Sequence, residues 1–399
     1  MVFMAGDNNL SSAGDADLAE MRQIGSSDRV NVVVEFDNAG NHGTRRFRIG
    51  KDGADEVVES LGETDSGSPE VLSSFISWAH ENYPADRYAL ILWNHGGGWE
   101  PSEVDRIARS VNSPGYNGRE LTERSSSTLG RVMFRSSLQS VFSLSSPTER
   151  AICSDDGTGH SLDTIELEKV IGAGAKTIGQ MFDLLGMDAC LMSNLEVAYQ
   201  VRKHVRYIVA SEENEPGDGW PYNRILGRLV ADPEISTAEF ACSIVSDYID
   251  SYTEFHFGDI VTQTAYDLSK IQNLLSPLDE LASYAIQNID QLRQSIWSSQ
   301  LNTTDFNGGT LRDIGHFCKE LEQRSDDKNV KAVANAVVEA HRVGDGNALI
   351  AEGHSGAKVE NCHGTTVYFP MQKISRYYGE LAFSKDFRWL DMLRSYFNV

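Results

Sequence analysis

The sequence has no long apolar run and is short of positive charge. No apolar stretch reaches the roughly 18 residues that a membrane-spanning helix needs, so a transmembrane protein is excluded. Lysine and arginine number 35 against 58 aspartates and glutamates, which gives a formal net charge of −23. A surface this acidic repels phosphate backbones, so we expect no nucleic acid among the partners. It still allows a local site that attracts a basic substrate.

Cysteine is scarce, and several familiar signatures are missing. Five cysteines in 399 residues make no disulfide framework, and the odd number leaves at least one thiol free or paired outside the chain. Without a CxxC or HExxH pattern we expect no zinc site, and without GxSxG no serine hydrolase. The stretch from Asp155 to Glu166 lacks the alternating acids and central glycine of a calcium loop, so an EF-hand is rejected.

The first residues carry no export signal. Val2 to Ala5 is typical of a buried strand, and neither a basic segment nor an apolar signal region of useful length precedes the turn at Gly6 to Asn9. We therefore leave the location open. The protein is cytoplasmic, or it is extracellular if a leader is missing from this form.

The first 100 residues alternate between strand and helix patterns. Val30–Phe36 and Tyr88–Trp93 are apolar and β-branched, as expected for strands buried on both faces. Leu18, Met21 and Ile24 have helical spacing, and Ser68-Pro69 is a typical helix start. This rhythm predicts right-handed crossovers and a mostly parallel sheet.

Residues 101–150 break the pattern. They hold 12 serines, no lysine, five acids and seven arginines, so the segment carries a net charge of about +2 in an acidic chain. Little in it could build a core, and we expect a long exposed insertion.

Strand and helix patterns return near Ala151, and the second half of the chain is mainly helical in pattern. We expect a helix at 162–171, a strand at 181–187, a helix at 191–204 and a strand at 206–211. Further helices are expected at 236–256, 268–297, 310–323 and 329–342, with short strands at 261–266 and 365–369. The division predicted from this is an α/β core over residues 1–234 and a largely helical region over residues 235–399, packed on the core.

His95 stands directly after the predicted strand that ends at Trp93, and Gly96, Gly97 and Gly98 follow it. Open α/β folds place their sites at this edge of the sheet, and glycines let a substrate backbone approach closely. No helix pattern and no Lys-Ser/Thr follow, which argues against a phosphate-binding loop. A capping histidine in a tight loop remains an equal alternative for this motif alone.

Cys190 stands between a predicted strand and a predicted helix, where a helix N-terminus favours the thiolate. Plain packing is the alternative, because cysteine is among the most buried residue types. Taken together, His95 and Cys190 end two predicted parallel strands, so both can face one crevice as a proton carrier and a nucleophile. Cys362 and His363 are adjacent, and adjacent strand residues point to opposite faces, so they make a poor pair. Cys153, Cys242 and Cys318 are interpreted as structural.

Five motifs in order make the chain resemble a known family. They are Phe3–Leu10, Trp93–Trp99, Met187–Met192, Ala210–Glu213 running into Pro216–Tyr222, and Thr366–Pro370. They resemble the clostripain family, within the clan of cysteine peptidases that includes caspases, legumains and gingipains. The resemblance implies a caspase-like α/β/α sandwich, Cys190 as nucleophile, His95 as general acid and base, and cleavage after arginine or lysine.

The chemistry then needs two further features. The backbone N–H groups of Gly96 and Cys190 are candidates for the oxyanion site. A pocket for arginine needs a carboxylate that accepts a forked pair of hydrogen bonds, for which we favour Asp188, followed by Asp218, with turn capping as the alternative for both. No cofactor is required for the chemistry, and calcium is implied by the family resemblance only.

The expected partners are proteins or peptides with basic residues, and the oligomeric state is left open. Two other functions remain, namely an inactive caspase-like scaffold and a thiol hydrolase acting on small amides. Seven of the chain's 24 arginines lie in the 101–150 insertion, so we also expect self-processing there. The candidate sites, in order of preference, are Arg150, Arg124, Arg131 and Arg135.

Overall fold

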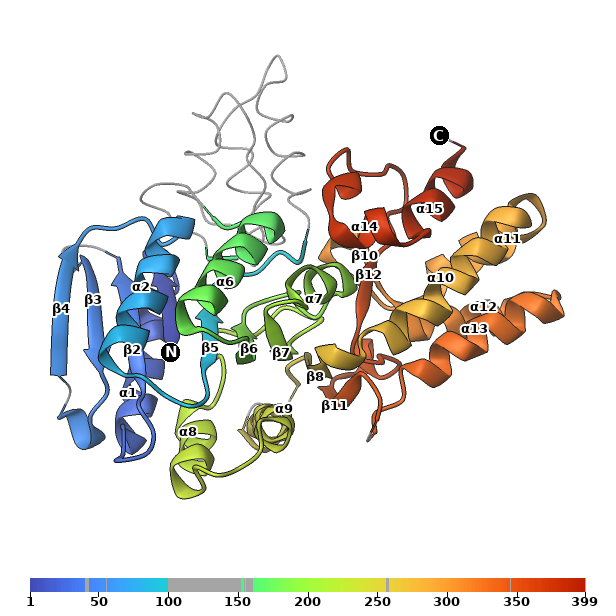
Figure 1. The fold of residues 1–399 in the computed structure, drawn as a ribbon. Helices are drawn as coiled ribbons and strands as arrows, with labels where there is room; N and C mark the ends of the chain where they lie inside the picture. Colours follow the sequence, from blue (N-terminus) through green and yellow to red (C-terminus); the bar gives the residue numbers. More distant parts are fainter. Residues whose placement is uncertain are drawn as a thin grey trace, which may run out of the picture. The chain divides into compact units, whose positions relative to one another are not determined.

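The computed structural model describes residues 1–39, 43–54, 56–99, 152–153, 155, 161–255, 258–344 and 346–398 (Figure 1). The chain forms two compact units, of which the first comprises Met1–Cys190 and Asn214–Ser236 and the second Leu191–Glu213 and Thr237–Val399. We expected one boundary at residue 234, whereas segment 191–213 groups with the C-terminal part. The predicted insertion at 101–150, with Arg124, Arg131, Arg135 and Arg150, lies outside the described residues.

The first unit contains an α/β sheet whose strands lie in the order β6-β5-β1-β2-β3-β4. Their bounds are β1 Val2–Gly6, β2 Val33–Asn38, β3 Gly43–Arg48, β4 Glu56–Gly62, β5 Ala89–Trp93 and β6 Phe182–Asp188. The strands from β2 through β1 and β5 to β6 pair in parallel, as predicted. The β3–β4 hairpin adds two antiparallel strands at one edge, so the sheet is mixed around the predicted parallel centre.

Helices cover both faces of this sheet. Phe3 of β1 packs its ring against Phe75 of α2 (Pro69–Asn82), with 6.0 Å between centroids. Neighbouring Met4 faces α1 (Ser11–Ile24), where a Cβ on Gly14 would lie 3.4 Å from its methyl group. Because successive strand residues point to opposite faces, α1 and α2 lie on opposite sides of the sheet. The expected α/β/α layering is therefore confirmed for this unit.

Two more helices complete these layers. Helix α6 (Thr164–Ile178) packs against α2, and α8 (Tyr222–Ala231) packs against α1. The predicted cap of α2 is correct, since the Ser68 hydroxyl accepts from the Glu70 amide at 3.2 Å. Helix α6 begins with a capping box between Asp163 and Glu166, so Asp163 is its N-cap.

The second unit is built mainly from helices, with antiparallel strands. Strands β7 Val205–Ala210, β8 Val261–Asp267 and β11 Leu349–Ser355 pair antiparallel, and β9 Asp305–Phe306, β10 Leu311–Asp313 and β12 Thr366–Tyr368 form a small antiparallel sheet. The helices include α7 Leu195–Val201, α9 Thr237–Phe255, α10 Gln272–Gln287, α11 Ile289–Asn302, α12 Ile314–Arg324, α13 Lys328–Ala340, α14 Ala382–Asp386 and α15 Trp389–Phe397. The predicted helical character is confirmed, whereas β9, β10 and β11 were not expected, and β10 takes up the first residues of the helix expected at 310–323.

None of the helices in the described part of the chain is long and apolar enough to cross a bilayer.

Candidate active site

The strand register brings His95 and Cys190 to the same edge of the first unit's sheet. Trp93 of β5 is the pairing partner of Asp188 in β6, and the Asn94 amide continues the ladder by donating to the Asp188 carbonyl at 3.2 Å. His95 and Cys190 each follow their paired strand residue by two positions. Both segments leave the buried sheet core together, since parallel strands end at one edge.

The loop after β5 is anchored before it reaches His95. The Asn94 side chain donates to the Ala5 carbonyl of the neighbouring strand β1 and accepts from the His95 amide. His95 keeps part of its surface exposed. Burial of its ring lowers the pKa of His95 to about 3, so the imidazole is neutral near pH 7. A neutral imidazole can accept a thiol proton and later return it to a leaving group.

Cys190 is nearly buried, with 7% of its surface exposed. The backbone amide of Glu215 donates to the Cys190 sulfur at 3.3 Å, and the thiol faces the Glu215 carbonyl at 3.9 Å. A donor aimed at the sulfur favours the thiolate over the thiol. The expected helix at 191–204 is shorter, since α7 begins only at Leu195. The backbone donor at the sulfur is thus the Glu215 amide rather than the helix N-terminus that we had expected.

Asp188, expected to lie near the crevice, is 5% exposed at the end of β6. Its Oδ2 accepts from the Tyr222 hydroxyl at 2.9 Å and from the Trp220 amide at 3.4 Å. Burial raises the pKa of Asp188 to about 6. The carboxyl is held in a defined orientation by these donors and by a hydrogen bond with the Glu215 side chain, and it loses its charge at a higher pH than an ordinary aspartate.

A second buried carboxyl, Asp17 of α1, lies beside Asp188. Asp17 is 3% exposed and accepts from the Trp93 indole N–H at 2.6 Å. A Cβ on Gly219 would lie 3.3 Å from Asp17 Oδ2 and 3.4 Å from both carboxyl oxygens of Asp188. The positive φ of +57° at Gly219 and its missing side chain thus let both carboxyls approach the same loop.

Carboxyl groups are concentrated around this pair. Burial and then the charge of Asp188 raise the pKa of Asp17, to which Glu20 and Asp218 also contribute. Burial, followed by the charge of Asp188, also raises the pKa of Glu215 well above its usual range. A cationic side chain from a ligand would relieve this repulsion, because it stabilises the charged form of each carboxyl.

Asp218, the second predicted pocket residue, lies on the exposed part of the loop between Glu215 and Trp220. The Gly219 amide closes a turn there by donating to the Pro216 carbonyl at 3.0 Å. The structure therefore separates the two candidates: Asp188 is buried at the strand end, and Asp218 is at the surface within electrostatic reach of Asp17.

Sequence reasoning missed Asp17 and Glu215. Asp17 lies four positions before Met21 on the buried face of α1, and a charged residue on an apolar helix face is a signal that could have been used. Glu215 lies in the polar stretch before Pro216, where nothing distinguishes it from its acidic neighbours. Only the folded loop brings its amide to the cysteine sulfur.

The remaining predicted site atoms are backbone groups. Gly96 is buried and forms an isolated antiparallel bridge with Ile152. Whether its N–H and that of Cys190 stabilise an oxyanion stays a prediction.

The other buried cysteines have surroundings that disfavour reactivity. Burial raises the pKa of the thiols of Cys153, Cys318 and Cys362 above the ordinary range. The thiolate is the nucleophilic form, so these side chains suit structural roles better than attack on a carbonyl.

The chain is similar in sequence to a known protein family. The sequence profile of the Clostripain family matches residues 2–120 and 140–396. Clostripain of Hathewaya histolytica is 29% identical over 262 residues, which cover 58% of this chain and 42% of that relative. The match thus spans less than half of the relative's length.

Solved structures agree in fold. An inactive zymogen of a C11 protease from Parabacteroides distasonis has a TM-score of 0.67 at 19% identity, covering 97% of this chain and 96% of that one. A secreted C11 cysteine protease from Bacteroides thetaiotaomicron, in complex with an irreversible peptide inhibitor, has a TM-score of 0.61 at 18% identity, covering 99% and 97%. At these identities the likeness shows a shared fold.

Proposed function

Because this chain belongs to the clostripain family of cysteine peptidases, we propose that it is an endopeptidase that cleaves after arginine or lysine. One observation carries the proposal. The paired ends of β5 and β6 present His95 and Cys190 at the sheet edge where Asp188 and Asp17 bury their carboxyls.

The proposed reaction begins with proton transfer from the Cys190 thiol to the neutral His95 imidazole. The thiolate, with the Glu215 amide near its sulfur, attacks the scissile carbonyl carbon and forms a tetrahedral oxyanion. The backbone N–H groups of Gly96 and Cys190 are the proposed donors to that oxyanion. The imidazolium returns its proton to the leaving amine, and water then hydrolyses the thioester with His95 again acting as base.

The proposed specificity rests on the buried carboxyls. An arginine guanidinium offers a planar fork that matches a carboxylate, and lysine offers a point charge. Asp188 is held by Tyr222 and Trp220 in one orientation, which suits a forked pair of hydrogen bonds. Exposed Asp218 would attract the basic side chain at the surface before it reaches Asp188.

A peptide assay tests the function against its two alternatives. Fluorogenic peptides ending in arginine or in citrulline, its neutral isostere, are incubated with and without a thiol alkylator. We expect rapid hydrolysis of the arginine peptide, slow hydrolysis of the citrulline peptide, and loss of both after alkylation. An inactive scaffold would hydrolyse neither, and a small-amide hydrolase would cleave small amides without the preference for arginine.

The preference for arginine should depend on pH through Asp188. Burial raises the pKa of Asp188 to about 6, so its carboxylate is present above pH 6 and is protonated as the pH falls through 6. The ratio of kcat/KM for arginine to that for citrulline should therefore fall between pH 7 and pH 5. His95 does not account for this fall, since it acts on both substrates alike and its titration cancels in the ratio. A ratio that stays constant from pH 5 to pH 8 would argue against a role for Asp188.

Self-processing is the second expected consequence. The 101–150 segment carries seven arginines and separates His95 from Cys190 in sequence. A cut there leaves β5 paired with β6, because the ladder that joins the two strands lies outside the 101–150 segment. We expect wild-type protein to run as two fragments under denaturing electrophoresis, cut after Arg150 first, or after Arg124, Arg131 or Arg135. Cys190→Ala should run as one band. An active enzyme whose segment stays intact by mass spectrometry would rule out this step.

A further inference from the structure

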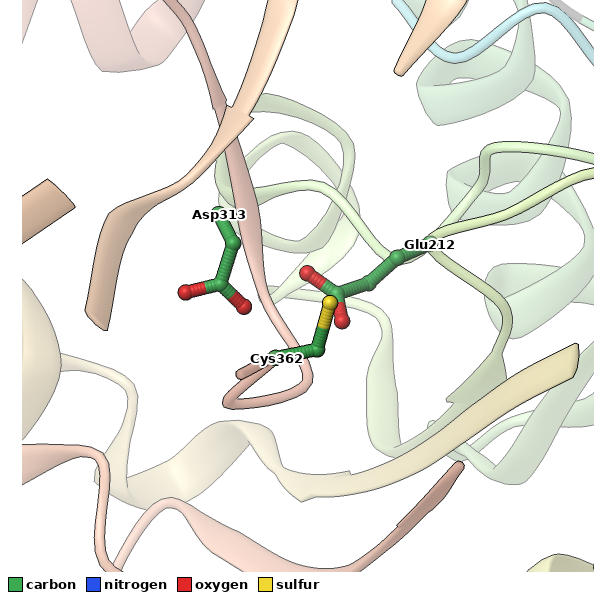
Figure 2. A group of neighbouring side chains, drawn as sticks. All are labelled: Glu212, Asp313 and Cys362. Carbon is green, nitrogen blue, oxygen red and sulfur yellow. The ribbon is translucent and has the colours of Figure 1, made fainter. Parts of the chain in front are cut away.

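The second unit contains a separate group of possible metal ligands, Glu212, Asp313 and Cys362 (Figure 2). Two carboxylate oxygens and a sulfur lie within 4.8 Å of one another. The three residues follow β7, end β10 and precede β12, respectively. Glu212 and Asp313 are fully buried, and Cys362 is 6% exposed. Such a set of side chains is expensive to bury unless each is paired.

Asp313 is held firmly by its neighbours. Its carboxylate caps α12 by accepting from the His316 amide at 2.6 Å, and it accepts from the His363 amide at 2.6 Å. The His363 ring nitrogen Nδ1 lies 3.3 Å from Asp313 Oδ1. An imidazole beside a carboxylate ligand is the kind of outer contact that orients metal ligands. Asp313 is therefore positioned without needing a partner from Glu212.

Glu212 is only half satisfied. Its Oε2 accepts from the Gly364 amide at 3.1 Å. Its Oε1 is buried and has no hydrogen-bond donor among the described residues. Figure 2 shows this carboxylate directed toward Asp313 and the Cys362 sulfur. Two carboxyls facing each other in a dry site need either a shared proton or a cation between them.

We propose that Glu212, Asp313 and Cys362 bind a zinc ion. Zinc accepts thiolate and carboxylate together, whereas calcium and magnesium take oxygen ligands, so this group does not fit the calcium that the family resemblance implies. Zinc bonds of about 2.0–2.3 Å place tetrahedral ligand atoms about 3.3–3.8 Å apart, so the side chains need to close by about 1 Å. Cys362 gives up its proton on binding, and the three ligands leave a fourth position open.

A zinc ion here would differ from our expectation of no zinc site, which was based on the spacing of ligands in the sequence. Zinc motifs read from sequence place two ligands within a few residues, whereas these ligands stand at positions 212, 313 and 362. An ion at this point would tie the end of β7, the start of α12 and the loop before β12 together. Because no such link exists in the unfolded chain, zinc binding should stabilise the folded second unit.

The test uses the full chain carrying Cys190→Ala, which removes the candidate catalytic thiol as a competing ligand. The protein is stripped with a chelator, and zinc content and Tm are measured after zinc is restored. Cobalt is added in parallel, because a Co²⁺–thiolate bond gives a charge-transfer absorption band. We expect one zinc per chain, a higher Tm with zinc than without it, and a cobalt–thiolate band.

Three variants in the same background assign the ligands. Glu212→Gln and Cys362→Ser should each weaken zinc affinity by about 10–100-fold or more, and Cys362→Ser should also lose the cobalt band. Cys318→Ala removes a buried thiol of the same unit that is not one of the three proposed ligands. It should change neither the zinc affinity nor the cobalt–thiolate band. If Glu212 and Asp313 only share a proton, Glu212→Gln keeps the hydrogen bond between the two side chains. Zinc then shifts the Tm of neither the Cys190→Ala protein nor its Glu212→Gln variant. That result, or a full zinc response in Glu212→Gln, would overturn the proposal.

Discussion

Replacing Cys190 with alanine is expected to lower kcat/KM for an arginine peptide by about 10⁴-fold or more, as loss of a nucleophile does in other triad and dyad enzymes. Replacing His95 with alanine should cost about 10²–10⁴-fold, the usual contribution of a general acid and base. Both changes remove groups at the paired ends of β5 and β6 and leave the strand ladder intact, so the Tm should change little.

The control for the Cys190→Ala and His95→Ala variants is Cys242→Ala. It removes a half-buried thiol in α9 and should keep activity. Activity is measured by initial rates on the fluorogenic arginine peptide, with circular dichroism to verify folding. Retained activity in Cys190→Ala, with loss in another cysteine variant, would move the nucleophile elsewhere.

Asp188→Asn is expected to reduce the preference for arginine far more than it reduces stability. Losing a buried charged partner typically costs about 2–5 kcal/mol, which corresponds to a fall of about 30-fold to several thousand-fold in the arginine-to-citrulline ratio of kcat/KM. Folding should tolerate the change, because asparagine keeps the shape and still accepts from Tyr222 and Trp220. Burial raises the pKa of Asp188 to about 6, so a neutral amide at this position removes a charge that burial disfavours.

Asp218→Asn serves as the matched comparison at the exposed end of the same loop. It should change the ratio by a smaller factor, and the change should diminish at high salt because exposed charges are screened. An unchanged ratio in Asp188→Asn would remove that residue from the pocket and leave Asp218 as the candidate.

Buried strands of the first unit were predictable because their sequences are apolar and β-branched. The apolar runs Val32–Val34 and Leu90–Trp93 mark β2 and β5, and both strands lie in the parallel part of the sheet. Strand β3 was missed because three of its six residues are arginines. Arg46 is nevertheless buried, since its Nε donates to Glu35 of β2 at 2.6 Å and its Nη1 to Glu59 of β4 at 2.9 Å. A strand stabilised by internal ion pairs carries no apolar pattern.

The division into units was not predictable from local pattern. Segment 191–213 follows Cys190 without a break in composition, yet it belongs to the second unit. The Thr366 amide donates to the Ser193 carbonyl at 3.0 Å, and Asn194 forms a bridge with Thr366. Contacts between residues more than 170 positions apart leave no trace in sequence periodicity.

Some residues of the candidate site could be predicted from the sequence and others could not. His95, Cys190 and Asp188 stand at strand ends that the sequence marks locally, so they could be proposed without a structure. Asp17 lies in α1, more than 170 residues before Cys190, and only the folded chain brings it close to Asp188. The amide of Glu215 is a backbone group, and a sequence gives no information about where a backbone donor points.

Covalent labelling with an irreversible peptide inhibitor tests the central claim most directly. The inhibitor carries arginine next to a thiol-reactive ketone, and the site of attachment is read by mass spectrometry of the digested wild-type protein. We predict one adduct on Cys190, none on the Cys190→Ala protein, slower labelling of His95→Ala, and slower labelling by the citrulline analogue. An adduct on Cys362 or another thiol, or equal labelling by the arginine and citrulline inhibitors, would contradict the account.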